Sequence, residues 1–340
     1  MSLMAEDPTH GSPNLAAPPL MAAHALSKTF IVGKTIAPGS GRVLHAVDEV
    51  SLDIAQGETL GLVGESGSGK STLGRCLTRL YDVTAGSLTF EGQEIGKADQ
   101  RALKPFRRKV QMIFQDPSAS LNPRRRVRDM LAEVLTVHKI RQGTGVEARL
   151  GELMDLVGLR RAYLDRYPHE FSGGQRQRIG IARALAVEPK LIVADEPVSA
   201  LDVSVQAQIV NLFSDLRDKL DLTYVFIAHD LAVVRQVSTR VAVMYLGSIV
   251  EIGETDALYQ HPSHPYTEAL LSAIPQPHNR GKRSRILLSG EIPSPLDPPV
   301  GCKFNTRCAY ATDLCRTVRP KLAQVSPERL VACHYPLFQE

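Results

Sequence analysis

The stretch GESGSGKS, residues 64–71, decides the fold of this 340-residue chain. It fits the pattern G-x-x-x-x-G-K-[ST] and lies between an apolar, strand-like run and a stretch with the character of a helix. The glycines let such a loop curl so that successive backbone N–H groups point at phosphate oxygens. Lys70 supplies a positive charge for the phosphates, and Ser71 offers a hydroxyl ligand to Mg²⁺. The sequence therefore predicts a phosphate-binding loop followed by a helix whose positive end faces the anion.

Four apolar runs share one pattern, because each is rich in Leu, Val, Ile or Phe and ends abruptly in polar residues. They are TLGLVG (59–64), KVQMIFQ (109–115), KLIVADE (190–196) and TYVFIAHD (223–230). Continuous apolar strands separated by helical stretches predict a parallel sheet covered on both faces. Ligands bind such sheets at the carboxyl ends of the strands, where these polar residues fall. Short antiparallel strands are expected over residues 22–61, and a hairpin over 86–95.

Three of these strand ends carry groups suited to catalysis. We expect Asp195 to hold the metal through water and Glu196 to orient or deprotonate the attacking water. A capped strand end is the alternative interpretation of this pair. Gln115 could reach the metal or the water, but a simple loop position explains a single Gln equally well. His229 closes another strand, and taken alone such a histidine is more often packed than catalytic.

A second helix start suited to an anion lies in FSGGQRQR, residues 171–178. Ser172 and Gln175 have the S-x-x-Q spacing of a capping box, so a helix should begin there. The two glycines leave the first N–H groups of that helix open to a close anion. Spacing alone does not say whether this helix and the phosphate-binding loop meet the same nucleotide.

The composition is that of a soluble globular protein, with 43% hydrophobic and 22% charged residues. The net charge is only +4, so we expect no nucleic-acid partner. No apolar run approaches the roughly 18 residues of a membrane-spanning helix. Residues 1–20 are typical of a disordered arm and lack the basic and apolar regions of a secretory signal. We therefore expect a cytosolic chain whose thiols stay reduced.

Four cysteines near the end of the chain are separated by five, six and seventeen residues: Cys302, Cys308, Cys315 and Cys333. Four thiolates can close a zinc tetrahedron or hold a [4Fe–4S] cluster. The spacing matches neither the close pairs of structural zinc nor the ferredoxin runs, so the metal's identity and the alternative of free thiols stay open. His334 is an alternative ligand. Cys76 follows the phosphate-binding loop and is expected to be a small core residue.

The order of these motifs resembles that of ATP-binding cassette (ABC) ATPases. GESGSGKS, the Gln115 strand end, FSGGQRQR, LIVADEP, SALD (199–202) and the His229 strand end follow the order of that family over residues 22–260. The resemblance implies an α/β P-loop NTPase fold with a RecA-like core, an antiparallel β subdomain and a helical subdomain at about 117–180. It also implies that ATP lies between two subunits, held by the phosphate-binding loop of one and the FSGGQ segment of the other.

The same resemblance implies a role for each matching residue. Phe30 would stack on adenine, although tyrosine is commoner at this position, and Phe171 stands where leucine is usual. His229 would contact the γ-phosphate, and Asp202 would link the two sites. Mg²⁺ would be held by Ser71, Gln115 and Asp195. ATP would be bound by Gly64, Glu65, Ser66, Gly67, Ser68, Gly69, Lys70, Ser71 and Thr72 of one subunit and by Ser172, Gly173, Gly174 and Gln175 of the other.

Further segments resemble the dipeptide and oligopeptide importer branch of this family. They are NPRRRV (122–127), EPVSALDVSVQAQ (196–208), HPSHPYT (261–267), SGEIPSPL (289–296) and the final cysteines. The likeness covers the chain from about residue 22 and is strongest to the F-type ATPase subunit. It implies a nucleotide-binding domain over 21–260 and an extension over 261–340 that carries a [4Fe–4S] cluster, with zinc as the alternative. We expect the cluster to support the small tail, with redox sensing as a second role.

The branch also implies partners. A related D-type ATPase subunit and two membrane permease subunits would complete a peptide importer at the cytoplasmic face of the cell membrane, and an extracytoplasmic binding protein would deliver the peptide. Nickel and glutathione importers use the same ATPase design and stay as alternatives. A soluble ABC protein acting on ribosomes or DNA is disfavoured, because the chain has one cassette and no sustained heptads. The basic stretches 101–110 and 122–129 would dock on the membrane subunits or remain solvated.

Overall fold

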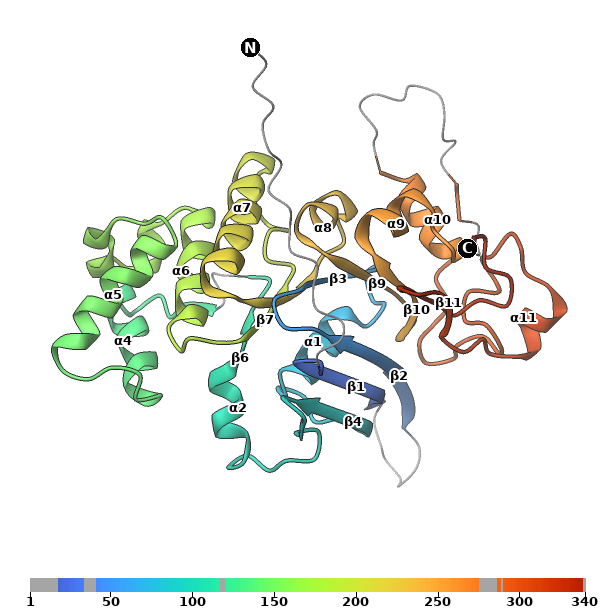
Figure 1. Cartoon of the computed structure of the whole chain (residues 1–340), viewed down its shortest axis with the longest axis horizontal. Coiled ribbons are helices and arrows are strands. Elements are labelled where there is room, and N and C mark those ends of the chain that lie inside the picture. The colour runs from blue at the N-terminus through green and yellow to red at the C-terminus, as the bar shows by residue number, and fades with distance from the viewer. Residues whose placement is uncertain (1–17, 34–40, 117–119, 275–285, 289, 339–340) are drawn as a thin grey trace, which may run out of the picture.

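The computed structural model describes residues 18–33, 41–116, 120–274, 286–288 and 290–338. The predicted disordered arm, residues 1–20, lies almost wholly outside these ranges, as does residue 289 of the SGEIPSPL segment. A long sheet runs through the middle of the molecule, with a helical lobe at one end, a second sheet beneath it and the cysteine-bearing extension at the other end (Figure 1).

The central sheet has eight strands, and its middle is parallel. Its order is β11 (Ala323–Ser326), β12 (Arg329–Val331), β10 (Ser248–Glu254), β9 (Arg240–Tyr245), β3 (Thr59–Val63), β8 (Thr223–Ile227), β7 (Leu191–Asp195) and β6 (Val110–Ile113). Each neighbouring pair from β9 to β6 is parallel. The four apolar runs form β3, β6, β7 and β8, so the predicted parallel sheet is confirmed.

The smaller sheet is antiparallel, as predicted for the first part of the chain. Its order is β2 (Arg42–Ile54), β1 (Met21–Val32), β4 (Ala85–Phe90) and β5 (Gln93–Glu94). The pair β4 and β5 is the predicted hairpin over 86–95. In Figure 1 this sheet lies below the central sheet, on the side of α1.

The parallel strands are apolar throughout because each face packs into a different core. On β8, Tyr224 and Phe226 belong to a core that includes residues of the helical lobe and of α7 and α8. Val225 and Ile227 of the same strand belong to a second core, shared with α1 and the antiparallel sheet. Alternation of side chains along a strand thus fills both layers.

Helices cover both faces of the central sheet and form the lobe. They are α1 (Lys70–Leu77), α2 (Leu103–Lys109), α4 (Val127–Val137), α5 (Thr144–Leu156), α6 (Gly173–Leu185), α7 (Val203–Leu220), α8 (Leu231–Val237), α9 (Thr255–Gln260), α10 (Pro265–Ser272) and α11 (Asp313–Thr317), with 3₁₀ turns η1 (Arg161–Asp165) and η2 (Pro168–Glu170). The lobe contains α4, α5 and α6 (Figure 1). In the described part of the chain, every helix is too short or too polar to cross a membrane.

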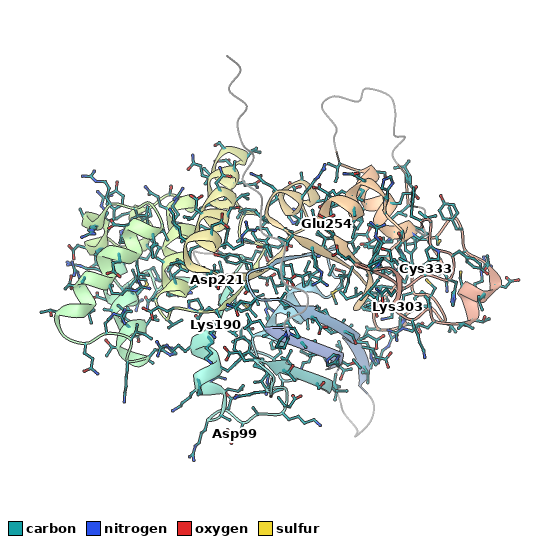
Figure 2. The ribbon with its side chains drawn as sticks, viewed as in Figure 1. Asp99, Lys190, Asp221, Glu254, Lys303 and Cys333 are labelled. Carbon is teal, nitrogen blue, oxygen red and sulfur yellow. The ribbon has the colours of Figure 1, made fainter. Side chains whose placement is uncertain are left out.

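The extension is built into the central sheet. Its strand β12 pairs antiparallel with β10, with Val331 opposite Glu251 and Leu330 opposite Ile252. Figure 2 labels Lys303 and Cys333, which both lie in this part of the molecule. Glu251 is fully buried and accepts backbone N–H bonds from Ser263 and His264, which anchors the start of α10 to the same strand.

A buried ion pair ties β3 and β9 of the central sheet to the antiparallel sheet. Glu58 immediately precedes β3 and is fully buried, and Arg240 Nη1 lies 3.1 Å from its Oε2 atom. The same Nη1 atom donates to the carbonyl of Asp53, near the end of β2. Burial raises the pKa of Glu58, and the charge of Arg240 opposes that rise. The pair therefore joins three strands at one point.

We expect Arg240→Met to lower the free energy of unfolding by about 3 kcal/mol, because it leaves the Glu58 carboxylate buried without its partner. Adding Glu58→Gln should restore part of that loss. Arg235→Met is the matched control: it breaks the exposed pair with Asp256 and should cost less than about 1 kcal/mol. Urea denaturation of the four proteins measures these differences, and equal losses for the two arginine variants would contradict the assignment.

Candidate functional site

The phosphate-binding loop connects β3 to α1, and Lys70 occupies its centre. The Lys70 ammonium donates to the carbonyl oxygens of Gly64 at 2.7 Å and of Glu65 at 2.8 Å. Burial lowers the pKa of this ammonium, and the carboxylates of Glu196 and Asp195 oppose the shift. Lys70 therefore stabilises the curled loop and places its ammonium group beside the backbone that would bind phosphate.

Two glycines of the site are required by close packing. Gly69, just before α1, has φ of +103°, and a Cβ there would come within 2.2 Å of the Ala46 carbonyl oxygen. Gly174, in the first turn of α6, would place a Cβ 2.4 Å from Cγ1 of Val205 on α7. Only glycine lets the chain approach this closely at both helix starts.

Two of the three residues expected to hold Mg²⁺, Ser71 and Asp195, are in contact. Ser71 Oγ donates to Asp195 Oδ1 at 2.7 Å, and Arg75 Nη2 lies 4.0 Å from Oδ2 of the same carboxylate. Burial raises the pKa of Asp195, while the Ser71 hydroxyl bond lowers it. A hydroxyl and a carboxylate at the mouth of a phosphate-binding loop are hard oxygen ligands, so the donor set fits Mg²⁺.

The three residues expected to take part in catalysis converge as well. Gln115 Nε2 donates to Glu196 Oε2 at 3.0 Å, and His229 Nδ1 lies 3.4 Å from the same oxygen. Gln115 and His229 are exposed, whereas the Glu196 carboxylate is mostly covered. Glu196 has φ of +47°, an unusual conformation for a residue with a side chain, and such strain is concentrated at functional sites.

The FSGGQ segment forms a helix start, as predicted, but it is separate from the phosphate-binding loop. Ser172 caps α6: its Oγ accepts from the Gln175 N–H at 3.3 Å, and Gln175 Oε1 accepts from the Ser172 N–H at 3.0 Å. Among the residues that the structure describes, neither side chain bonds to the loop. Asp202 is the N-cap residue of α7 and is exposed, beside Val203, whose exposed fraction is 82%.

The aromatic residue proposed for adenine lies at the end of β1. Phe30 is half-buried and packs edge-on against Tyr81, with ring centroids 5.6 Å apart. Lys28 Nζ lies 5.0 Å from the centroid of the Phe30 ring. The structure therefore presents Phe30 within a small aromatic and cationic group, which contains a second ring that the sequence analysis did not single out.

The four cysteines of the extension line one cavity of about 20 Å³. They are free thiols, and Cys76 is likewise free and buried on α1, as predicted. Within the described residues, no group of three or more His, Cys, Asp or Glu side chains is arranged to hold a metal ion. His334, the alternative ligand, shares a 2.8 Å hydrogen bond with the Val318 carbonyl. The structure thus brings the thiols together but does not support a formed metal site.

Sequence reasoning missed two contacts to the phosphate-binding loop. Arg307 of the extension forms an ion pair with Glu65, and the Tyr266 hydroxyl accepts a hydrogen bond from the Glu65 N–H at 2.9 Å. Tyr266 belongs to the HPSHPYT segment, which served only as a marker of resemblance. Arg307 precedes Cys308 in a stretch that was considered only for its thiols, and no local pattern could link it to a residue 242 positions away.

Comparison with known families agrees with these motifs. The family model described as "ABC transporter" matches residues 47–199. A second model, described as "Oligopeptide/dipeptide transporter, C-terminal region", matches residues 250–315. The two matches include the phosphate-binding loop, the FSGGQ segment, Asp195 and Glu196, and the first three cysteines of the extension.

Several curated proteins are similar along most of their length. The putative oligopeptide transport ATP-binding protein YkfD of Bacillus subtilis is 53% identical over 93% of this chain and 95% of its own length. The oligopeptide transport ATP-binding protein AppF of the same organism is 52% identical over 86% of this chain and 89% of its own. A putative peptide import ATP-binding protein of Brucella abortus is 56% identical over 87% and 89%.

Solved structures share the fold. The ATP-binding cassette MJ0796, in a dimeric post-hydrolysis state with ADP and phosphate, superposes with a TM-score of 0.62 at 28% identity, covering 69% of this chain and 98% of its own. CbiO1 of Clostridium perfringens has a TM-score of 0.62 at 22% identity over 72% and 92%, which supports the fold alone. The predicted P-loop NTPase fold is confirmed. This chain belongs to the ABC transporter family and carries the C-terminal region of its oligopeptide/dipeptide branch.

Proposed function

We propose that this protein is the ATP-hydrolysing subunit of an importer that takes up di- and oligopeptides. The observation that carries the proposal is the convergence of Ser71, Asp195, Glu196, Gln115 and His229 beside a phosphate-binding loop. Phosphoryl transfer to water requires a phosphate-binding loop, ligands for a metal ion and a general base, and these groups can supply all three. The names of the similar curated proteins supply the peptide substrate.

Each of these residues would have a separate role in ATP hydrolysis. When bound, Mg²⁺ would offset the charge of the β- and γ-phosphates, and Ser71, Asp195 and Gln115 would supply or orient its ligands, a role supported by the Ser71–Asp195 contact. Lys70 would exchange its bonds to loop carbonyls for bonds to phosphate oxygens. Glu196 would accept a proton from the attacking water, and His229 beside it would donate to the γ-phosphate.

The site is completed by a second subunit. In the described residues Ser172 bonds to Gln175 and not to this chain's own loop, so ATP would be shared with the loop of a partner, and the exposed Asp202 would lie at that junction. A ligand that binds only the closed pair can drive closure through its differential affinity. We propose a D-type ATPase paralogue as this partner.

Association with membrane permease subunits follows from the importer class, and we place the pair peripherally at the cytoplasmic face of the membrane. An extracytoplasmic binding protein would deliver the peptide. The basic stretches 101–110 and 122–129 offer less free charge than their sequence suggests, because Lys109, Arg125 and Arg128 pair with carboxylates of this same chain. Docking on the permease would therefore depend on other parts of the surface as well.

The four-cysteine cavity supports a further part of the proposal, a thiol-bound metal centre. Burial raises the pKa of the Cys302 and Cys308 thiols, and raises that of the Cys333 thiol to about 11, so burial disfavours a bare thiolate at these three positions. The Tyr335 N–H points at Cys333 Sγ at 3.4 Å, and Thr312 Oγ1 lies 3.6 Å from Cys315 Sγ. Four sulfurs with such donors offer the ligand number of a [4Fe–4S] cluster or of zinc.

Glu196→Gln should lower ATP turnover by about 100-fold or more while leaving ATP affinity within about 3-fold, because it removes the proton acceptor and keeps the shape. Turnover is measured as phosphate release by the full chain with its partner subunits, and affinity by equilibrium binding of ATP. Glu268→Gln, a half-buried position on α10 outside the proposed catalytic group, is the matched control and should leave both values unchanged. Normal turnover in Glu196→Gln would refute the catalytic assignment.

Uptake in cells tests the substrate. Deleting the chain should abolish import of labelled di- and oligopeptides, and supplying the wild-type chain should restore it, whereas the Glu196→Gln variant should not. Labelled glutathione and ⁶³Ni²⁺ serve as the comparison cargoes. Normal peptide uptake with a selective loss of nickel or glutathione uptake would transfer the assignment to those importers.

Anaerobic purification tests the metal centre. We expect the wild-type chain to carry about four iron atoms with the broad visible absorption of a cluster, and the variant with Cys302, Cys308 and Cys315 changed to Ser to carry none. Cys76→Ala removes a buried thiol outside the cavity and should retain the metal. One zinc per chain without colour would identify the alternative ion, and a metal-free wild-type chain would reject the centre.

A further inference from the structure

The extension contacts the phosphate-binding loop at Glu65, the second residue of the loop. Arg307 Nη1 donates to Glu65 Oε2 at 2.7 Å, and Arg307 Nη2 donates to Oε1 at 3.0 Å. Two parallel N–H bonds from one guanidinium fix both the position and the orientation of a carboxylate. The contact joins residues 242 positions apart, so only the folded extension can make it.

Arg307 is held in place by aromatic side chains. Its own side chain is 6% exposed, and its guanidinium lies 5.9 Å from the centroid of the Tyr245 ring. Tyr245 packs in turn against Tyr266, at 4.7 Å, and Phe304, at 5.3 Å between ring centroids. Such a buried arginine has little freedom to follow a moving partner, so it restrains Glu65.

The restraint reaches the atoms that meet phosphate. The Glu65 N–H donates to the Tyr266 hydroxyl at 2.9 Å, and its carbonyl accepts from Lys70 Nζ at 2.8 Å and from the Ser68 N–H at 3.1 Å. Glu65 is thereby held at its side chain, its amide and its carbonyl. Fixing Glu65 therefore fixes the curl of the loop and the resting place of the Lys70 ammonium.

The ion pair also has an electrostatic consequence. The Glu65 carboxylate belongs to the loop that would bind a polyanion, and like charges at close range repel strongly where water is partly excluded. The bound guanidinium cancels that charge. Without Arg307, the loop would both lose an anchor and present an unpaired negative group near the phosphates.

We infer that Arg307 is a positioning residue for the nucleotide: the cysteine-bearing extension sets the affinity of the phosphate-binding loop through the Arg307–Glu65 pair. This inference rests on the nucleotide site of the proposed function. Arg307 directly precedes Cys308, which lines the cysteine cavity. A change in the conformation of that cavity would therefore also move Arg307 and, through it, the phosphate-binding loop. The extension is then part of the nucleotide site and more than a support for the tail.

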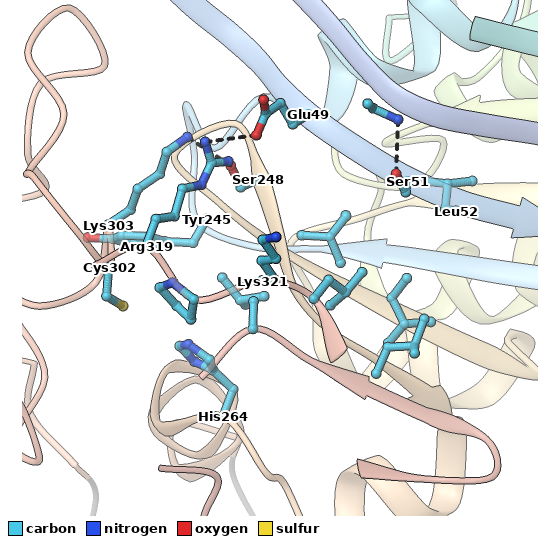
Figure 3. A pocket seen from close by; sticks show the side chains of 18 of the residues that line it. Glu49, Ser51, Leu52, Tyr245, Ser248, His264, Cys302, Lys303, Arg319 and Lys321 are labelled. Atoms are coloured by element: carbon cyan, nitrogen blue, oxygen red, sulfur yellow. Dashed lines mark hydrogen bonds and ion pairs between the residues drawn. The ribbon is translucent and has the colours of Figure 1, made fainter. Parts of the chain in front are cut away.

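The extension has other anchors, and these provide controls. Lys303 Nζ lies 2.7 Å from Asp48 Oδ2, and Arg319 Nη1 lies 3.0 Å from the same atom and 3.3 Å from Glu49 Oε2. Figure 3 shows Lys303 and Arg319 side by side at the edge of a cavity of about 620 Å³, on the side of β2. Lys303 is nearly as buried as Arg307, but it bonds to Asp48 and to the turn between β9 and β10, and none of its hydrogen bonds or ion pairs goes directly to the phosphate-binding loop.

Equilibrium binding of Mg²⁺–ADP to the full-length chain, measured by calorimetry, tests the inference without turnover. Arg307→Met should weaken binding by about 10-fold, since it removes two hydrogen bonds between charged groups. Glu65→Gln should cost about 3-fold or less, and the double variant should bind more tightly than Arg307→Met, because no unpaired carboxylate remains. Lys303→Met should stay within about 2-fold of wild type.

Three results would overturn the inference. They are an unchanged Mg²⁺–ADP affinity in Arg307→Met, an equal loss of affinity in Lys303→Met, and a loss of binding free energy in the double variant equal to the sum of the losses in the two single variants. Should Arg307→Met fail to fold, Arg307→Lys carries the same test, with a loss of about 3-fold because a point charge replaces the two-pronged contact. A wild-type chain that binds no nucleotide at all would instead reject the proposed function.

Discussion

The 2.7 Å bond between Ser71 and Asp195 is the contact on which the rest of the site depends. It exists because β3 and β7 both lie parallel to β8, so their carboxyl ends reach the same edge of the sheet. The same register brings Gln115 from the end of β6 and His229 from the end of β8 to the Glu196 carboxylate. A parallel sheet buried on both faces thus gathers five residues from four distant segments into one polar rim.

In the proposed function, that rim is half of a catalytic site. The second helix start, at Ser172, is formed and capped, yet it makes no bond to the loop in the described chain. Gly174 is pressed against Val205 on α7, so the FSGGQ segment is coupled to the helix that begins at the exposed Asp202. Both features suit a surface that meets another subunit. The proposed function therefore accounts for the two helix ends suited to anions in one chain, because they would serve two different nucleotides.

Sequence predicted the parts whose information is local. The strands β3, β6, β7 and β8, the loop with Lys70 and the capping box at Ser172 each follow from a few adjacent residues. The Arg307–Glu65 pair and the Tyr266 contact do not, because they arise only when the extension packs against the core. The cysteines show an intermediate case: their gathering in one cavity agrees with the expectation, but ligation depends on side-chain orientations that spacing cannot fix.

The dependence of ATP hydrolysis on association is the most direct test of this account. The rate per chain should be measured over a dilution series, with and without the partner subunit, alongside sedimentation of the same samples. Two half-sites that act only together predict a rate that falls toward zero as the chains separate into monomers. A monomeric chain that hydrolyses ATP at the full rate would contradict it.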